Sequence, residues 1–243
     1  MKFYLDREWF IDTTEFIDLS IGVATHGVRA WYLDYPRISP VMENGFVGSV
    51  ELGGAVNFRD IYFNPHGHGT HTESHGHIST DVYPVSKCFN QFFFDAQLIT
   101  INPTVIGGDR VITADQLARV QPCEALVIRT EPNNQNKCSM NYSATNPTYM
   151  DLACVVKLNE CGVKHLLVDI PSVDKEIDGG ILAFHHAFWN VPENPVLDRT
   201  ITELIFVPSD VEDGAYILEL QVSNFENDAA PSRPLLYKKR KEA

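Results

Sequence analysis

The sequence predicts a single α/β domain built on a mixed sheet with crossover helices. Three apolar segments of strand length lie at residues 93–101, 125–128 and 164–170, and helical patterns separate them. Strands that alternate with helices pair in parallel, because each helix carries the chain back across the sheet. At 243 residues, with 44% hydrophobic residues and no low-complexity linker, one sizeable core is expected. The domain should span residues 1–237, followed by a basic solvated tail at 238–243.

Two helices are predicted from their end signals. Residues 113–116 read T-A-D-Q, a capping box in which the threonine and glutamine side chains satisfy free backbone amides. Asn146 followed by a proline is typical of a second helix start. Gly162 is typical of a left-handed stop after about Glu160.

The flanking regions are predicted to add further strands. A short strand is expected at residues 15–21, two more at 46–52 and 58–63, where apolar side chains alternate, and a long one at 215–225. The polar loop at 131–146 is long for a compact domain, which favours a lid or binding loop, with disorder as the alternative.

Composition argues against several classes of function. A net charge of −13 disfavours nucleic acid and anionic membrane surfaces as partners. No apolar run approaches the roughly 20 residues that span a bilayer, and the first residues lack an apolar signal-peptide core. Five cysteines without C-x-x-C spacing are typical of reduced thiols, so we expect a cytoplasmic protein. The partner we expect is a small-molecule substrate.

The most informative feature is a histidine tract. Residues 66–77 read H-G-H-G-T-H-T-E-S-H-G-H and hold five of the nine histidines together with one carboxylate. Imidazole and carboxylate are the ligands of Zn²⁺ and Mn²⁺ hydrolytic sites, with Zn²⁺ favoured here and Mn²⁺ the alternative. A surface tract that binds metal loosely is the competing interpretation. The position of the tract between apolar strands favours a built metal site.

Spacing within this tract predicts which side chains share a face. In an extended chain alternate side chains point the same way. The first set is His66 and His68; after a break at Gly69 and Thr70, the second set is His71, Glu73, His75 and His77. A turn at the glycine would aim both sets at one point, and the number of glycines disfavours a helix.

Further ligands are expected from distant parts of the chain, because a catalytic metal keeps an open position and draws its ligands together through the fold. His185 and His186 follow a glycine pair where a helix can begin. Glu203 lies in the apolar run 201–207, where a carboxylate is costly to bury unless it is paired or binds metal. Ordinary core or surface packing is the alternative for the histidines, and an outward-facing side chain for Glu203.

The ordered set of these residues resembles a known family. G-T-H-x-E-x-x-x-H at residues 69–77 is similar to the H-x-G-T-H-x-D-x-P-x-H signature of the metal-dependent cyclase family, which includes bacterial kynurenine formamidases and isatin hydrolases. D-I-P-S-V-D at 169–174 resembles the family's D-x-x-S-x-D segment, and D-L-S at 18–20 resembles its opening D-L-[ST]. Three positions depart from the signature: Gly67 replaces its first histidine, Glu73 its aspartate and His75 its proline.

The resemblance implies a swivelling β/β/α fold and a homodimer or homotetramer. It also implies one or two metal ions per chain. The ligands carried over by position form two sets: His71 and Glu73, completed by His66 or His68, for one ion; and Glu73, His185 and Glu203 for a second.

The resemblance further implies a metal-dependent hydrolase that cleaves an amide C–N bond through a metal-activated water. An arylformamidase acting on N-formylkynurenine-like substrates is one such enzyme. His77 matches the family's catalytic histidine and would pass a proton to the leaving amine. Trp31, Tyr32 and Tyr35 would form an apolar wall for an aryl group, unless they serve ordinary packing. Two alternatives stay open: a lactone or cyclic-amide hydrolase on the same site, and a non-catalytic metal-binding protein, which the glycine at position 67 motivates.

Overall fold

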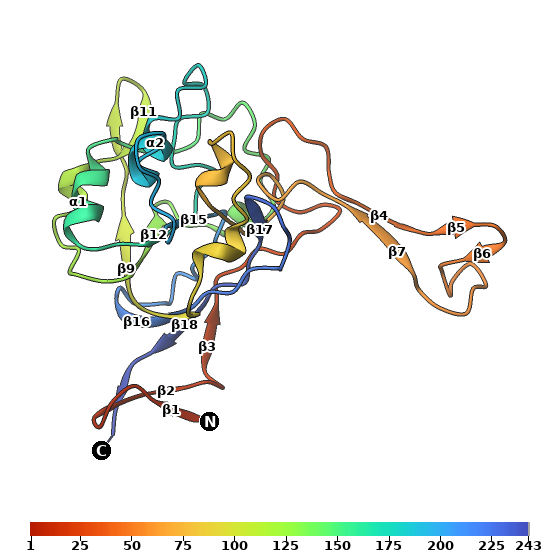
Figure 1. Ribbon diagram of the computed structural model, residues 1–243, viewed down its shortest axis with the longest axis horizontal. Helices are drawn as coiled ribbons and strands as arrows, with labels where there is room; N and C mark the ends of the chain where they lie inside the picture. Colours follow the sequence, from red (N-terminus) through yellow and green to blue (C-terminus); the bar gives the residue numbers. More distant parts are fainter. Residues whose placement is uncertain (243) are drawn as a thin grey trace.

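A computed structural model describes residues 1–242 and centres on a nine-stranded mixed sheet with two short helices (Figure 1). In spatial order the strands are β17 (Ala229–Pro231), β8 (His71–Glu73), β15 (Thr200–Glu203), β14 (His165–Val168), β12 (Ala125–Thr130), β9 (Phe93–Ile101), β16 (Gly214–Glu219), β18 (Leu235–Lys238) and β3 (Phe16–Asp18). The helices are α1 (Cys154–Glu160) and α2 (Ala183–Trp189), and short 3₁₀ turns cover His75–His77, Val85–Cys88, Ala114–Leu117 and Gln135–Cys138.

The central strands confirm the predicted parallel pairing. β9, β12, β14 and β15 are hydrogen-bonded neighbours in parallel, and β8 joins β15 in the antiparallel direction. Side chains of β12 alternate between two cores: Leu126 and Ile128 pack with both helices, whereas Ala125 and Val127 pack on the opposite face. Strands buried on both faces are nearly continuous in apolar residues, which is why these segments are recognisable in the sequence.

The predicted helix ends are confirmed at one helix start and one helix stop. Thr113 and Gln116 form the predicted capping box, although the turn it opens is a single 3₁₀ turn. Gly162 adopts φ +76° just after α1. The expected start at Asn146 is wrong, because the backbone at Tyr149–Met150 forms strand β13 instead.

Pairing with neighbouring chain segments displaces that helix start. β13 lies parallel to β11 (Asp109–Ile112), which also pairs with β10 (Thr104–Ile106). The amide of Met150 additionally donates to the carbonyl of Val173 at 2.9 Å. These long-range bonds hold residues 149–150 extended, so the α1 helix begins only at Cys154.

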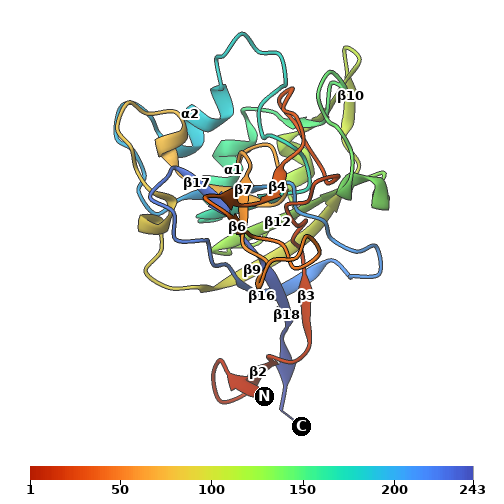
Figure 2. The same ribbon diagram turned by 90° about the vertical axis from the view of Figure 1, so that its right-hand side faces the viewer.

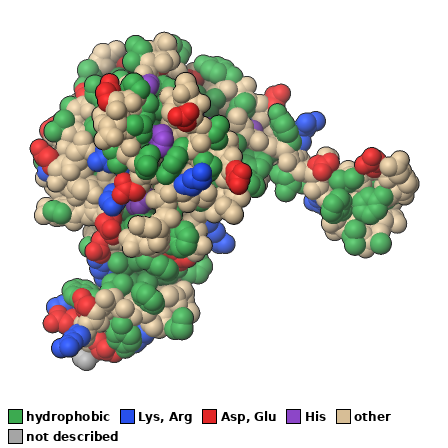
Figure 3. All heavy atoms as spheres, viewed as in Figure 1, with side chains coloured by type: hydrophobic (Ala, Val, Ile, Leu, Met, Phe, Trp, Pro, Cys, Tyr) green, Lys and Arg blue, Asp and Glu red, His purple; other side chains and the backbone are tan. Residues whose placement is uncertain are grey.

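Residues 37–62, which we call the arm, project away from the sheet (Figure 1). The arm consists of β4 (Arg37–Pro40) paired with β7 (Arg59–Tyr62) and, at its tip, β5 (Met42–Glu43) paired with β6 (Phe46–Val47). The strand expected at 46–52 is therefore only two residues long. Hydrophobic side chains gather on the tip of the arm (Figure 3). The arm faces the viewer in Figure 2, in front of the sheet.

The two ends of the chain lie together below the sheet (Figures 1 and 2). β1 (Lys2–Tyr4) pairs with β2 (Trp9–Asp12), and β2 pairs with β19 (Arg240–Lys241). The expected solvated tail at 238–243 is largely exposed in its described part, but its backbone pairs in strands. Basic side chains there form ion pairs with acidic residues near the N-terminus, Lys241 with Glu8 at 3.7 Å and Arg240 with Glu15. Residue 243 lies outside the described residues.

The strand expected at 215–225 ends early, at Glu219, and the chain then crosses to the opposite edge of the sheet. There it forms β17 beside β8, which brings residues 229–231 next to the histidine tract. Within residues 1–242 all five cysteines are free, and no helix is long and apolar enough to cross a membrane.

Replacing Leu126 by alanine should lower the free energy of unfolding by about 2–5 kcal/mol, because this fully buried side chain leaves a cavity between β12 and the helices. Urea-induced unfolding measures the change. Val156→Ala, on the exposed face of α1 (62% exposed), is the matched control and should change stability by roughly 0.5 kcal/mol or less. Equal losses in the two variants would contradict this description of the core.

Candidate metal centre

Two neighbouring strands place the first pair of ligands. His71 and Glu73 lie two residues apart on β8, so their side chains share one face. The antiparallel register sets Glu203 of β15 directly opposite His71. The Nε2 atom of His71 lies 3.5 Å from the Oε2 atom of Glu203, and all three side chains are buried. The predicted inward orientation of Glu203 is therefore observed.

A tight turn at Gly69 directs this strand into the site. Gly69 adopts φ +85°, and a Cβ atom there would lie 2.7 Å from the carbonyl oxygen of Ile21. Thr70 locks the turn, because its hydroxyl accepts from the amide of Ile21 at 2.7 Å and donates to the carbonyl of Leu204. Only glycine combines this backbone conformation with so close an approach. The glycine therefore acts as the bend that the spacing predicts.

Glu73 is the centre of the cluster and is 1% exposed. Its Oε1 atom lies 3.0 Å from Nε2 of His185. Its Oε2 atom lies 3.0 Å from Nδ1 of His66 and 4.0 Å from Nε2 of His77. Burial by itself would raise the pKa of this carboxyl, but the neighbouring histidines outweigh burial and hold the pKa well below its usual value. The site is therefore built to keep a negative charge at Glu73.

A second carboxylate orients His185 at the start of α2. Asp174 Oδ2 accepts from Nδ1 of His185 at 2.6 Å, and Asp174 also accepts from the backbone amides of Phe184 and His185. Burial acts to lower the pKa of His185, but its bonds with Asp174 and Glu73 outweigh burial and raise it to about 10. Asp174 thus fixes the ring with Nε2 directed at Glu73, the arrangement that carboxylates give to metal-binding histidines.

His66 and His68 have different partners in the structure. His66 lies in the cluster, whereas both ring nitrogens of His68 bond to the backbone: Nδ1 accepts from the amide of Asn64 at 2.9 Å, and Nε2 donates to the carbonyl of Asp34 at 2.8 Å. A neutral imidazole has one donor and one acceptor, so His68 has no nitrogen left for a metal. The expectation that included His68 among the ligands is corrected in favour of His66.

Two other histidines also lie outside the cluster. The ring of His75 packs on Tyr83, with 4.4 Å between ring centroids. Nδ1 of His186 donates to the carbonyl of Val191 at 3.0 Å. His75 therefore contributes to local packing, and His186 closes the turn after α2.

Asp228 joins the site and was not anticipated from the sequence. Its Oδ2 atom lies 2.8 Å from Nε2 of His66 and 3.5 Å from Nδ1 of His77. Burial would raise the pKa of Asp228, but the two histidines lower it overall. Nothing in the polar segment around residue 228 marks this aspartate, because only the pairing of β17 with β8 brings it to the tract. Asp174 stands in a recognised segment, but its spacing does not reveal its contact with His185.

The donor set fits a divalent metal. Nδ1 of His71 donates to the carbonyl of Gly69 at 3.2 Å, so its Nε2 atom carries a lone pair; within residues 1–242 this buried Nε2 has no hydrogen-bond partner. Three overlapping groups of side chains each bring their ligand atoms within 4.8 Å: His66, His71 and Glu73; Glu73, His77 and His185; and His66, His77 and Asp228. Buried imidazole lone pairs facing carboxylates suit Zn²⁺ or Mn²⁺.

A cavity of about 450 Å³ opens onto this centre. His66, Glu73, His77, His185 and Glu203 lie in its wall, together with the apolar side chains of Trp31, Leu33 and Leu182. Of the three aromatic residues considered for that wall, only Trp31 is in place. Tyr35 packs instead on the guanidinium of Arg29, and Tyr32 is exposed. Histidine atoms are visible between hydrophobic side chains on the surface of the body (Figure 3).

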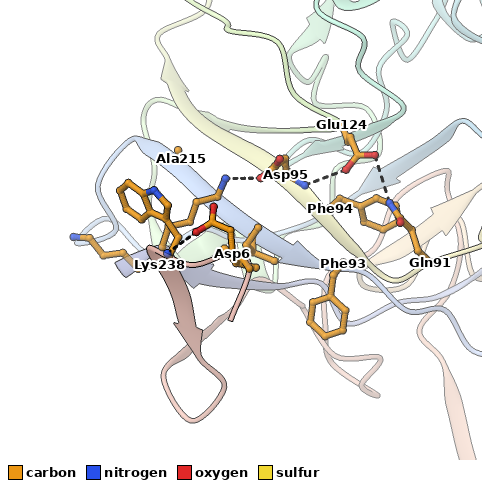
Figure 4. Close-up of a pocket in the computed structure, with 12 residues that line it drawn as sticks. Asp6, Gln91, Phe93, Phe94, Asp95, Glu124, Ala215 and Lys238 are labelled. Carbon is orange, nitrogen blue, oxygen red and sulfur yellow. Dashed lines mark hydrogen bonds and ion pairs between the residues drawn. The ribbon is translucent and has the colours of Figure 1, made fainter. Parts of the chain in front are cut away.

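A larger cavity of about 930 Å³ lies away from this centre, beside the N-terminal strands (Figure 4). Its carboxylates are already engaged: Asp95 pairs with Lys239, and Glu124 accepts from the amide of Asp95 and from the side chain of Gln91. No histidine lines it. Chemistry rather than size therefore identifies the smaller cavity as the candidate site.

Comparison with solved structures yields proteins of the same fold. A protein described as a potential metal-dependent hydrolase with cyclase activity matches with TM-score 0.63 at 15% identity, covering 92% of this chain and 97% of its own. Isatin hydrolase A from Ralstonia solanacearum gives 0.65 at 13% identity, covering 92% of this chain and 91% of its own. Isatin hydrolase A from Labrenzia aggregata, bound to benzyl benzoate, gives 0.64 at 12% identity, covering 92% of this chain and 93% of its own. The expected cyclase-like fold is thereby confirmed.

The family match covers the tract but not the whole site. The family model described as "Putative cyclase" matches residues 17–175, more than half of the 243-residue chain. No curated protein matches the sequence. The matched range holds the histidine tract and Asp174, whereas His185, Glu203 and Asp228 follow it. On the strength of this match, the chain belongs to the cyclase family.

Proposed function

We propose that this protein is a metal-dependent hydrolase that cleaves an amide C–N bond. The observation that carries the proposal is the buried, unpartnered Nε2 atom of His71, which lies 3.5 Å from Oε2 of Glu203 and in the same ligand group as Glu73. Both carboxylates lie in the wall of a cavity. Solved structures of the same fold include metal-dependent and isatin hydrolases, which supports a hydrolytic role. Zn²⁺ is the metal we propose, with Mn²⁺ as the alternative.

One or two ions would be held through Glu73. One would take His66, His71 and Glu73, whose ligand atoms lie within 4.8 Å of one another. A second would share Glu73 with His185 and Glu203, since the two oxygens of Glu73 face different histidines. When bound, the metal would polarise the scissile carbonyl and lower the pKa of water.

His77 is the residue we propose for proton transfer. It is the most exposed of the clustered histidines, with 30% of its side chain accessible, and it lines the cavity. Its Nδ1 atom faces Asp228 at 3.5 Å, and its Nε2 atom lies 4.0 Å from Glu73 beside the cavity, close enough to exchange a proton with a substrate bound there. Imidazole exchanges protons near neutral pH, which suits delivery of a proton to a leaving amine.

The cavity wall supports an aryl substrate. Trp31, Leu33 and Leu182 supply an apolar surface next to the centre, which fits an arylformamide such as an N-formylkynurenine-like compound. A cyclic amide of the isatin type, or a lactone, is the second candidate, because isatin hydrolases share the fold. The open cavity beside the ligands argues against a non-catalytic metal-binding role.

We further propose that the protein is a homodimer or homotetramer assembled through the arm. Met42, Phe58, Ile61 and Tyr62 are each more than half exposed there. A two-stranded arm standing alone is only marginally stable in water, and exposed apolar patches mark association surfaces. Packing on a second copy of the chain would bury these side chains. The five free cysteines are consistent with a reducing cytoplasm, where we place the protein.

Metal content tests the centre directly. Protein purified without a histidine tag should hold about one or two zinc or manganese ions per chain by elemental analysis, and His71→Ala should lose metal because it removes a buried ligand. His68→Ala is the matched control and should keep its metal, since both nitrogens of His68 bond to the backbone. Equal metal content in wild type and His71→Ala would contradict the assigned ligands.

Turnover tests the reaction. Hydrolysis of formanilide should stop on chelation and return when metal is restored. His77→Ala should lower kcat by about 10²–10⁴ with metal content unchanged, because it removes the proton donor. His186→Ala, outside the cluster, should retain activity. Loss of metal from His77→Ala would make His77 a ligand. Faster hydrolysis of lactones than of formanilide would favour the second candidate.

Removing apolar surface from the arm should dissociate the assembly. Sedimentation velocity should show a dimer or tetramer for the wild type and a monomer for the double variant Phe58→Ser, Ile61→Ser, since both side chains are exposed in the single chain. Val105→Ser, which replaces an equally exposed apolar residue on β10, is the control and should leave the assembly intact. A monomeric wild type would rule out the proposed assembly.

A further inference from the structure

We propose that Asp228 is a positioning residue of the metal centre, which holds His66 and His77 so that their inner ring nitrogens face Glu73. The inference rests on the proposed metal-binding function. It goes beyond the family match, because residue 228 lies outside the matched range of 17–175.

Both rings lie between two carboxylates. On their outer edges, Oδ2 of Asp228 lies 2.8 Å from Nε2 of His66 and 3.5 Å from Nδ1 of His77. On their inner edges, Oε2 of Glu73 lies 3.0 Å from Nδ1 of His66 and 4.0 Å from Nε2 of His77. A carboxylate only accepts, so the outer nitrogens carry the protons. The inner nitrogen of a neutral His66 ring then presents its lone pair to a metal beside Glu73, and the inner nitrogen of His77 is directed at the same centre from 4.0 Å.

The arrangement repeats one already present on the other side of Glu73. Asp174 accepts from the outer nitrogen of His185 at 2.6 Å, and the inner nitrogen of His185 lies 3.0 Å from Oε1 of Glu73. Each oxygen of Glu73 therefore faces a histidine whose opposite ring nitrogen contacts an aspartate. Such outer partners raise the basicity of metal-binding histidines and fix their tautomer.

Stacking couples the two rings that Asp228 contacts. The centroids of His66 and His77 are 4.1 Å apart with an interplanar angle of 30°. Rotation of either ring would displace the other. One carboxylate oxygen on the shared outer edge is thus sufficient to orient both.

The backbone brings Asp228 to this edge by strand pairing. The carbonyl of Asp228 accepts from the amide of Ser74 at 2.9 Å, and the next residue, Ala229, pairs with Glu73 in the β17–β8 register. Gly76 permits the approach, because a Cβ atom there would lie 3.1 Å from the Cβ of Asp228 and 2.7 Å from the carbonyl oxygen of Tyr83. The glycine between His75 and His77 therefore makes room for this contact.

Zn²⁺ titration of the metal-free protein tests the assignment, with a chromophoric competitor reporting both affinity and stoichiometry. Asp228→Ala should weaken the dissociation constant by about 10–100-fold without changing the number of ions per chain. Asp228→Asn keeps an acceptor for the ring N–H but loses the charge, so it should fall between wild type and Asp228→Ala. Glu226→Gln, which changes a charge on an exposed side chain of the same loop, is the matched control and should bind as the wild type does.

A second readout separates positioning from general loss of structure. Nitrogen NMR of the histidine rings in the zinc-loaded protein should show the Nε2–H form of His66 in wild type and a mixture of forms in Asp228→Ala. The melting temperatures of the metal-free proteins should agree, and Asp228→Asn should partly restore the wild-type ring signal.

Three results would overturn the assignment. Unchanged affinity in Asp228→Ala would show that the contact does not position the rings. Loss of a whole ion per chain in that variant would make Asp228 a direct ligand. Failure of the wild type to bind zinc would overturn the metal centre and this inference together, whereas the first two results would leave the proposed function standing.

Discussion

Burial of the Glu73 carboxylate is the constraint on which the rest of this site depends. A charge that is 1% exposed is tolerated only when its surroundings replace the lost water. Here three imidazoles surround it, and each of them also contacts an aspartate on its outer edge. A metal between these groups would satisfy the same constraint, because it supplies the positive charge that the buried carboxylate requires. The centre is thus already organised around the charge that it would bind.

The order of the strands in the sheet positions the groups that surround Glu73. β8 lies between β15 and β17. Glu203 of β15 therefore meets His71 of β8, and Asp228, next to β17, meets His66 and His77 on either side of β8 in the sequence. α2 adds His185 from above the same strand. Because β14, β12 and β9 are packed on both faces, the edge that carries the site is attached to a rigid core. The arm, in contrast, leaves its apolar side chains exposed and available for association.

Much of the fold was predictable because it is encoded in local patterns. The central strands are nearly continuous apolar runs, and the capping box and Gly162 mark helix ends through local backbone chemistry. Prediction failed where distant pairing decided the local structure. Residues 149–150 are extended because β11 pairs with them. The strand predicted at 46–52 ends at Val47, where its pairing with β5 in the arm ends. Residues 240–241, near the end of the described chain, form β19 because they pair with the N-terminal strand β2.

The sequence by itself determined the composition of the centre: the histidine tract, its carboxylate, and His185 and Glu203 as distant partners. Family membership followed from the same ordered residues. Only the tertiary structure decided between His66 and His68, because their spacing is equivalent and their partners, Asp228 and the carbonyl of Asp34, come from other parts of the chain. It also brought Asp174 and Asp228 into contact with histidines of the centre. Sequence spacing reports which side chains share a face, but hydrogen-bond partners across a sheet are set by how distant strands pair.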